Sequence, residues 1–316
     1  MIRDQDLLVD ADSAGMRLDV FIVRRFPDSP RGLVSEAITR GDVTLNGRRG
    51  DKGATLRDGD TVRIDCLPER EDVRVQPNPD ILLDVVYEDA ALVAVNKPAN
   101  MAVHPLTFRE TGTLASGLVA RYPETRNLGD QPLFPAFVHR IDTDTSGLVV
   151  AARSVDAYMA LRRQFQERGV RKLYTALVYG RVKEDGAVDC PLAHHPQHPG
   201  RMIVVTNARR ARVSRPMRAV SRYRVLERFP GFSLLEVEIE TGVTHQIRCQ
   251  LASVGHAVAG DKVYATPAER RAGGPARQFL HAARLELSHP TTSDRLTLEA
   301  PLAPDLVSFV QDLRRS

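Results

Sequence analysis

The sequence has only three cysteines, Cys66, Cys190 and Cys249, and they lie far apart in the chain. Their odd number and wide spacing exclude a disulfide framework and a C-x-x-C metal site. A reducing compartment suits such a chain, and we therefore expect a cytoplasmic protein.

Long apolar runs are also missing. The first residues, MIRDQDLLVDAD, are acidic and lack the apolar core of an export signal. No run approaches the roughly 20 apolar residues that are needed to span a bilayer. We therefore expect a soluble protein without a membrane partner, and we expect it to be a monomer.

Acidic residues are absent from one long stretch. The whole chain has 44 basic and 40 acidic side chains and an isoelectric point of about 9.1. Between Pro191 and Leu226 there is no Asp or Glu, whereas eight arginines occur there: Arg201, Arg209, Arg210, Arg212, Arg215, Arg218, Arg222 and Arg224. This pattern is typical of a surface that meets phosphates, although a solvated strand face explains it equally well.

The length of 316 residues suits one large domain and one small domain. The segment 68–80, PEREDVRVQPNPD, is rich in proline and charge and poor in large apolar residues, as linkers are. We therefore predict a small domain over 14–67, a linker over 68–80 and a large domain over 81–316.

The small domain combines two amphipathic helices with a small sheet. Apolar residues at helical spacing predict helices around 18–22 and 33–38, and alternating residues around the turn at Asn46-Gly47 predict strands. With Arg17-Leu18-Asp19 and the Gly59-Asp60 ending, this segment resembles the S4-type RNA-binding domain. The resemblance implies that basic residues contact the RNA backbone, and the candidates are Arg17, Arg31, Arg40, Arg48, Arg49 and Lys52. For each of them an idle surface charge is an equally good interpretation.

In the large domain, strands are predicted over 82–87, 91–96, 148–151 and 235–239 and through KLYTALVYG, with helices after Ser154 and over 244–254. Ser154 is expected to cap the first of these helices, and the residues spaced for burial on it are Val155, Tyr158, Met159, Ala160 and Phe165. Strands outnumber helices and do not alternate with them regularly. The pattern predicts the α+β class with a mainly antiparallel or mixed sheet.

Five blocks of the large domain carry a more specific pattern. NKPANMAVHP, HRIDTDTSGLVVAARS, KLYTALVYG, TGVTHQIRCQLASVGHAVAGD and LHAARLELSHP follow one another between about residues 81 and 300. In order and spacing they resemble the RluA family of RNA pseudouridine synthases. The resemblance implies the fold of that family and an isomerisation of uridine in RNA that needs no metal and no cofactor. The absence of a P-loop and of G-x-G-x-x-G after a strand agrees with this expectation.

Asp142 occupies the position of the family's catalytic aspartate, so the resemblance implies that it acts either as a nucleophile or as a general base. Arg248, in THQIR, matches the arginine that pairs with it and would keep a partly buried carboxylate ionised. For an isolated aspartate in a turn, a local backbone cap would be the better interpretation.

The resemblance assigns three more residues near Asp142. Arg140 matches an arginine that helps to extrude the target base and to hold its phosphate. Tyr174 matches a tyrosine whose ring lies against the flipped uracil and whose hydroxyl assists proton loss from carbon 5. Lys172 shares the strand face of Tyr174 and is expected to contact a backbone phosphate or Asp142.

Other polar residues of these blocks receive structural interpretations. Asp144 precedes Thr, Ser and Gly and is expected to shape the loop. Histidines beside a sheet are usually hydrogen-bonded scaffold groups, and we assign that role to His104, His139, His245 and His281. The group His194, His195 and His198 lacks a neighbouring carboxylate or cysteine, which argues against a metal site.

The chain departs from the family pattern at five positions: Asn100, Thr143, Val243, Gln250 and Ala257. Loss of positive charge at 143 and 243 weakens the expected grip on RNA. The favoured hypothesis is a synthase acting on structured RNA, with large-subunit ribosomal RNA preferred and transfer RNA as an alternative. Two other classes stay open. One is a non-catalytic RNA-binding or ribosome-assembly protein on the same fold. The other is a glycosylase or hydrolase that uses Asp142, which is disfavoured because the sequence shows no second carboxylate placed to activate water.

Overall fold

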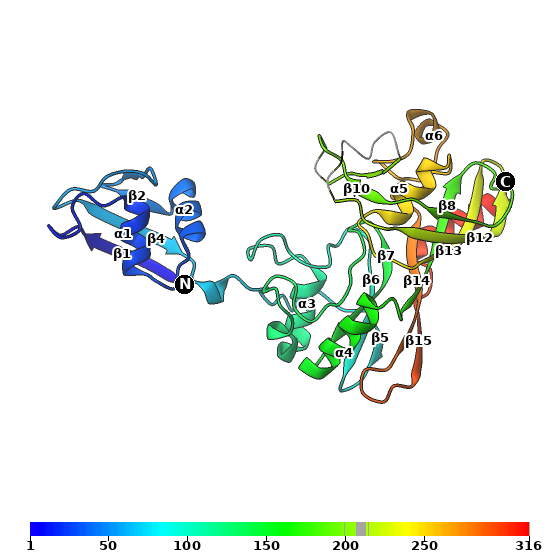
Figure 1. Ribbon diagram of the computed structural model, residues 1–316, viewed down its shortest axis with the longest axis horizontal. Helices are drawn as coiled ribbons and strands as arrows, with labels where there is room; N and C mark the ends of the chain where they lie inside the picture. The colour runs from blue at the N-terminus through cyan, green and yellow to red at the C-terminus, as the bar shows by residue number, and fades with distance from the viewer. Residues whose placement is uncertain (199, 207–212, 214, 316) are drawn as a thin grey trace. The chain divides into compact units, whose positions relative to one another are not determined.

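The computed structural model describes residues 1–198, 200–206, 213 and 215–315 and divides into two compact units, Met1–Arg74 and Val75–Ser316 (Figure 1). The division falls inside the predicted linker, but only part of that segment connects the units. The Val75 side chain is fully buried in the core of the second unit, and its N–H bonds the carbonyl of Pro132. The second half of the predicted linker is therefore packed structure.

The first unit is a four-stranded sheet, in the order β1-β4-β2-β3, packed against two helices. Its elements are β1 Ile2–Leu8, α1 Leu18–Arg25, α2 Arg31–Arg40, β2 Val43–Leu45, β3 Arg48–Arg49, β4 Thr61–Leu67 and a 3-10 turn, η1 Arg70–Asp72. The predicted start at residue 14 is too late, because β1 pairs with β4 from Ile2 onward. The sequence analysis missed this edge strand because most side chains of IRDQDLL are charged or polar and exposed.

The second unit is built on a nine-stranded sheet in the order β5-β6-β7-β14-β8-β13-β12-β9, with β15 also beside β14. Among the described strand pairs of this sheet, β7 and β14 alone run parallel, which confirms the predicted mainly antiparallel or mixed sheet. The strands are β5 Val85–Glu88, β6 Leu92–Lys97, β7 Ser146–Ala152, β8 Arg171–Tyr179, β9 Gly186–Asp189, β12 Val220–Phe229, β13 Phe232–Ile239, β14 Leu280–Ser288 and β15 Arg295–Glu299. A separate hairpin joins β10 Leu192–His194 to β11 Met202–Val204.

Helices cover both faces of this sheet. They are α3 Leu114–Arg121, the 3-10 helix η2 Pro123–Asn127, α4 Val155–Gln166, α5 Gln246–Ser253, α6 Pro267–Arg271 and α7 Pro304–Arg315. Alternate residues of β6 serve two cores: Val93 and Val95 pack with α3, whereas Leu92 and Ala94 pack with α4. A strand with both faces buried reads as a continuous apolar run, which explains its sequence.

The buried stripe of α4 differs from the predicted one. Val155 and Met159, predicted to be buried, are 64% and 54% exposed, whereas Ala157 and Leu161 are buried against β6 and β7. Ser154 caps the helix as predicted, because its hydroxyl accepts the N–H of Ala157. The helix was correctly located, but its rotation about its axis was set by the sheet beneath it.

Gly147 allows β7 and β14 to approach closely. Its φ is +112°, and a Cβ built there would lie 2.3 Å from the backbone oxygen of Ala282 in β14. Only glycine fits such a site without moving a strand. The close approach matters for function because β7 begins four residues after Asp142.

The surface expected to meet phosphates is partly neutralised. Arg222 and Arg224 of β12 form ion pairs with Glu240 and Glu236, and Arg218 lies 3.8 Å from Glu240. These glutamates follow or lie on the paired strand β13, so the acid-free stretch of sequence is not an acid-free surface. Arg209, Arg210 and Arg212 lie outside the described residues.

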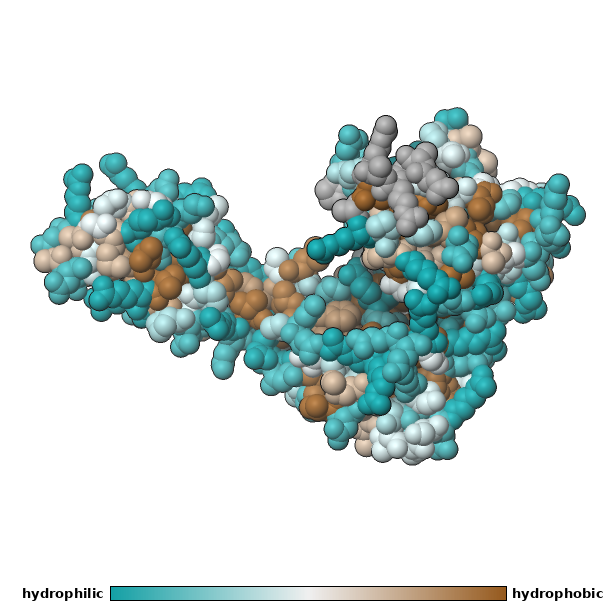
Figure 2. Space-filling model, viewed as in Figure 1, coloured by the Kyte–Doolittle hydropathy of each residue, from teal (hydrophilic) through white to brown (hydrophobic). Residues whose placement is uncertain are grey.

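Hydrophilic side chains dominate the visible face of each unit (Figure 2). Within the described part of the chain, no helix is long and apolar enough to cross a membrane.

Candidate active site

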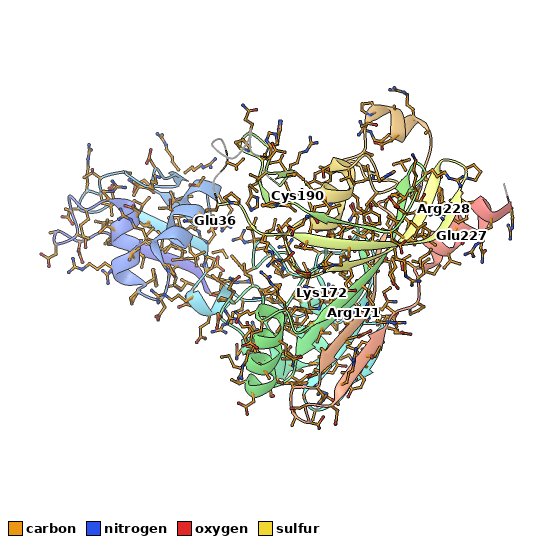
Figure 3. All side chains as sticks on the ribbon, turned by 45° about the vertical axis from the view of Figure 1, so that its right-hand side comes forward. Glu36, Arg171, Lys172, Cys190, Glu227 and Arg228 are labelled. Atoms are coloured by element: carbon orange, nitrogen blue, oxygen red, sulfur yellow. The ribbon has the colours of Figure 1, made fainter. Side chains whose placement is uncertain are left out.

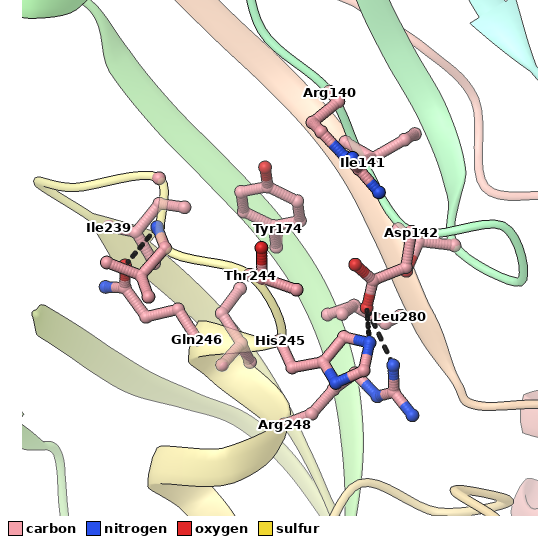
Figure 4. Close-up of a pocket in the computed structure, with 14 residues that line it drawn as sticks. Arg140, Ile141, Asp142, Tyr174, Ile239, Thr244, His245, Gln246, Arg248 and Leu280 are labelled. Atoms are coloured by element: carbon pink, nitrogen blue, oxygen red, sulfur yellow. Dashed lines mark hydrogen bonds and ion pairs between the residues drawn. The ribbon is translucent and has the colours of Figure 1, made fainter. Parts of the chain in front are cut away.

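A pocket of about 80 Å³ brings together segments that are far apart in the sequence (Figure 4). The loop before β7 contributes Arg140 and Asp142, β8 contributes Tyr174, and the start of α5 contributes His245 and Arg248. Its walls are both polar and apolar, since Ile141, Ile239, Ile247 and Leu280 also line it. Four of the five residues that the sequence assigned to the site therefore share one cavity, and the fifth, Lys172, does not line it.

Asp142 and Arg248 form the predicted ion pair. Arg248 Nη1 donates to Asp142 Oδ2 at 2.8 Å, and the side chains of Arg248 and Asp142 are 7% and 18% exposed. Helix α5 holds the arginine because its neighbours Ile247 and Leu251 on the same helix are buried in the core. The aspartate thus keeps one side open to the pocket while a nearly buried guanidinium supplies positive charge.

Asp261 is a second partner of Arg248 that the sequence analysis missed. Its carboxylate, which is 0% exposed, accepts Nε at 2.6 Å and Nη2 at 3.1 Å, and also the N–H groups of Val263 and Tyr264. Burial opposes ionisation, but the bonds from Arg248 lower the pKa of Asp261. Asp261 therefore fixes the guanidinium so that its free edge faces Asp142. It is the last residue of the block that begins TGVTHQIR, which was the available signal.

Tyr174 lies in the middle of β8, opposite Ala282 of β14 and Val237 of β13. Burial, reinforced by the charge of Asp142, raises the pKa of its hydroxyl. The ring is 8% exposed and faces the pocket. Tyr174 is therefore a neutral aromatic wall with a protonated hydroxyl.

Arg140 is exposed and Lys172 is buried, and both line a second hollow next to the first, together with Tyr174. Arg140 Nη1 lies 3.5 Å from His104 Nε2. Lys172 follows Arg171 at the start of β8 (Figure 3), and its ammonium donates to the carbonyl of Thr241 at 3.2 Å. Burial, then repulsion from Arg168, lowers the pKa of Lys172 to about 8. The structure shows no contact between Lys172 and Asp142, one of its two predicted partners.

Lys97 is a further residue that the sequence analysis did not single out. It is fully buried, and its ammonium donates to the carbonyls of Pro98, Met101 and Thr143 at 2.6, 2.7 and 3.0 Å. Burial, with repulsion from Arg277, lowers the pKa of Lys97 to about 7. The three bonds tie the NKPANM loop to the residue that follows Asp142, so Lys97 fixes the loop that carries the carboxylate.

The histidines divide into two groups. His139 Nε2 accepts the N–H of Val150, and His281 bonds the hydroxyl of Ser146, as expected for scaffold groups. His104 packs edge-on against Phe134. His245 differs, because it lines the pocket with its Nε2 3.8 Å from Asp142 Oδ2. Its assignment to scaffolding alone was incomplete.

The remaining polar residues of the motifs lie around the site. The backbone carbonyl of Asp144 accepts a bond from Arg277, which supports the loop-shaping role. Gln250 is fully buried and bonds Ser221 and the carbonyls of Cys190 and Ala219. This departure from the family pattern therefore fills a structural position outside the pocket.

Metal-ligand geometry is not found in the described ranges, where no three His, Cys, Asp or Glu side chains could hold an ion. The rings of His195 and His198 lie 4.5 Å apart, and His195 Nδ1 accepts the N–H groups of Gln197 and His198.

In the first unit, the predicted RNA-contacting arginines are at the surface. Arg17 and Arg31 are 49% and 63% exposed, and both bond the buried carboxylate of Asp19. Arg40 pairs with Glu36 and Asp42, and Arg48 lies on the exposed strand β3.

Comparison with known families gives two matches along the chain. Residues 91–253 match the model of RNA pseudouridylate synthases, and residues 16–62 match the model of the S4 domain. The first match contains Asp142, Tyr174 and Arg248, and the second contains Arg17, Arg31, Arg40 and Arg48.

Similar proteins cover nearly the whole chain. A ribosomal large subunit pseudouridine synthase D of Nitrosomonas europaea is 36% identical over 98% of this chain and 88% of its own. An uncharacterized RNA pseudouridine synthase of Chloroflexus aurantiacus is 40% identical over 99% and 94%. The structure of human RNA pseudouridylate synthase domain containing 1 superposes with a TM-score of 0.57 at 25% identity, covering 77% of this chain and 98% of that one. The chain therefore belongs to the RNA pseudouridylate synthase family and is an isomerase with an S4 domain at its N-terminal end.

Proposed function

We propose that this enzyme converts uridine to pseudouridine in large-subunit ribosomal RNA and that Asp142 is its catalytic carboxylate. The Nitrosomonas relative, which aligns over 98% of this chain, is a ribosomal large subunit pseudouridine synthase, and this similarity supports the choice of RNA. The observation that carries the catalytic assignment is the Asp142–Arg248 pair at 2.8 Å inside a pocket.

The reaction moves one bond. The bond between ribose C1′ and uracil N1 breaks, and its electron pair stays on the uracil. Asp142 either forms a transient bond to C1′ or removes the proton on C2′, because a carboxylate is competent for both tasks. After the ring rotates, C5 joins C1′ as Asp142 leaves C1′ or returns the proton to C2′. The proton on C5 is then lost and N1 takes up a proton, so the product is an isomer of the substrate. The atoms balance without water, metal or redox partner.

In the enzyme without substrate, the guanidinium of Arg248 stabilises the negative charge of the Asp142 carboxylate. Because Asp261 bonds the other edge of the guanidinium, its positive charge is shared between two carboxylates, and Asp142 is held less strongly than it would be in an isolated pair. This sharing leaves Asp142 available for reaction.

Tyr174 and Arg140 serve the everted nucleotide. The Tyr174 ring lines the pocket and is assigned to stacking against the pyrimidine, since base–aromatic stacking contributes about 1–3 kcal/mol. Its raised pKa keeps the hydroxyl protonated, so the phenol relays a proton and does not act as a phenolate base. Arg140 is exposed at the rim of both hollows, where it reaches a phosphate or the gap left in the stack.

The first unit provides general affinity for RNA through Arg17, Arg31, Arg40 and Arg48. Lys172 lies at the second hollow and contributes to the same grip. The enzyme is proposed to act as a cytoplasmic monomer, and light scattering of the purified chain checks its oligomeric state.

Tritium release tests the function. Purified protein is incubated, without metal or nucleotide, with unmodified ribosomal RNA that carries tritium at uracil C5, and transfer RNA serves as a parallel substrate. We expect release from ribosomal RNA by the wild type and none by Asp142→Asn. Asp144→Asn, which removes a neighbouring carboxylate, is the matched control and should keep most of the activity. Free uracil as product, binding without release, or release from transfer RNA alone would contradict the proposal.

A further inference from the structure

His245 occupies an unusual backbone position at the pocket. It is the N-cap residue of α5, with φ 55° and ψ 21°, in the left-handed region. A residue with a Cβ is strained there by about 1 kcal/mol or more, and such strain persists only where the surroundings impose it. The side chain is 17% exposed and lines the pocket beside Asp142 (Figure 4).

Contacts with Tyr264 determine which ring nitrogen of His245 carries the proton. The Tyr264 hydroxyl accepts the backbone N–H of Met202 at 2.8 Å and lies 3.0 Å from His245 Nδ1. Burial raises the pKa of this phenol, so its proton stays in place. Among the described residues, Nδ1 is the acceptor within hydrogen-bonding reach of that proton, so Tyr264 donates to Nδ1.

The ring is therefore neutral with its hydrogen on Nε2. Burial lowers the pKa of His245, although the charge of Asp142 partly opposes the effect. Nε2 lies 3.8 Å from Asp142 Oδ2, which is too long for a hydrogen bond. The N–H group thus faces the edge of the carboxylate without forming a hydrogen bond to it, and it lies at the wall of the pocket, within reach of an acceptor on a bound base.

We propose that His245 is a substrate-contacting residue that donates its Nε2–H to oxygen 2 of the everted uracil, and that Tyr264 is the positioning residue that fixes this tautomer. The inference rests on the proposed function. Oxygen 2 is chosen because its carbon is bonded to N1, which is bonded to the ribose C1′ that faces Asp142. Oxygen 4 lies across the ring, away from the carboxylate.

Such a bond strengthens as the reaction proceeds. When the C1′–N1 bond breaks, the electron pair that stays on the uracil is delocalised over N1, oxygen 2 and oxygen 4, and oxygen 2 is the carbonyl oxygen next to N1. A preorganised neutral donor aimed at developing charge contributes to kcat, and removal of one such donor costs about 10²–10³-fold in rate. A protonated imidazole would instead pair with Asp142, so the neutral form is required.

Kinetics of three variants test the proposal with tritium-labelled ribosomal RNA. His245→Ala should lower kcat about a hundredfold and leave KM nearly unchanged. His245→Gln places an amide N–H near the position of Nε2 and should recover at least tenfold of that loss. His245→Asn carries the same amide on a shorter chain that does not reach, and it should resemble His245→Ala. A cooperative melting transition above the assay temperature shows that each variant is folded.

Two further measurements separate this inference from the function itself. Nitrogen-15 NMR of the wild type should show the His245 ring protonated on Nε2 between pH 6.5 and 8.5, whether or not the enzyme is active. Transcripts with 2-thiouridine should react slowly and lose their dependence on His245, whereas transcripts with 4-thiouridine should retain it. Protonation on Nδ1, wild-type kcat in His245→Ala, or a folded His245→Gln as slow as His245→Ala would overturn the proposal. Absence of tritium release by the wild type would instead refute the proposed function.

Discussion

Replacement of Asp261 by asparagine tests whether the active site depends on its second carboxylate. The asparagine side chain would keep one oxygen for the backbone N–H groups of Val263 and Tyr264 but would turn an NH2 group toward the guanidinium of Arg248. Breaking one side of a buried ion pair costs about 3–5 kcal/mol. Asp142 still compensates the cation, so we expect the lower end, about 3 kcal/mol, in the free energy of unfolding of the second unit.

Asp261→Asn should also lower kcat in the fraction of the enzyme that stays folded, in addition to lowering the free energy of unfolding. Without Asp261, Arg248 is free to turn toward Asp142 with both ends of its guanidinium, so the carboxylate is bound more tightly and reacts less readily. We expect kcat for tritium release to fall about a hundredfold under conditions where the variant is fully folded, since about 2.7 kcal/mol corresponds to that factor.

Asp305→Asn is a matched control. Asp305 accepts two bonds from Arg277 at 2.7 and 3.0 Å, in the same geometry, but it is 54% exposed. The guanidinium of Arg277 is 8% exposed, but water reaches the Asp305 carboxylate, so we expect Asp305→Asn to cost less than Asp261→Asn, whose carboxylate is fully buried. Urea unfolding followed by circular dichroism suits both variants, because the chain has no tryptophan. Equal unfolding midpoints and equal kcat for Asp261→Asn and Asp305→Asn would refute the reasoning.

Three further predictions concern other parts of the chain. Gly147→Ala should destabilise the second unit by about 3 kcal/mol or more, because it adds a Cβ 2.3 Å from a backbone oxygen at positive φ, whereas Gly112→Ala, with open space, should have little effect in the same urea assay. Asp19→Asn should weaken RNA binding roughly threefold to tenfold, because this buried carboxylate orients two exposed arginines, even though the substitution removes a negative charge. Filter binding measures the affinity, and the exposed Asp58→Asn should show no such loss. Tighter binding by Asp19→Asn would contradict the idea. Burial, with repulsion from Lys172, lowers the pKa of His139 to about 3, so the unfolded state binds more protons between pH 6.5 and 3. Stability should therefore fall as pH falls through that window, by up to about 1.4 kcal/mol per pH unit, and His139→Gln should flatten the dependence of the urea midpoint on pH.

The spacing of apolar, capping and turn-forming residues along the chain predicted individual helices and strands. The helix after Ser154, the strand KLYTALVYG and the mixed sheet were all predicted, because capping, β-branched runs and breakers act over a few residues. The five ordered blocks also predicted the Asp142–Arg248 pair across 106 residues of sequence. That success came from resemblance to a family, since periodicity says nothing about such a distant contact.

Only the tertiary structure decided which charges share space. The local sequence around Asp261 and Lys97 does not show that they are buried. In the structure both are buried, and they bond Arg248 and the carbonyl of Thr143, the two groups next to Asp142. In the sequence the arginines of β12 indicated a cationic surface, but in the structure the pairing of β12 with β13 places glutamates beside them. A carboxylate, an ammonium or an imidazole acquires its role from the dielectric and the partners around it, and these depend on chain segments that the local sequence does not contain.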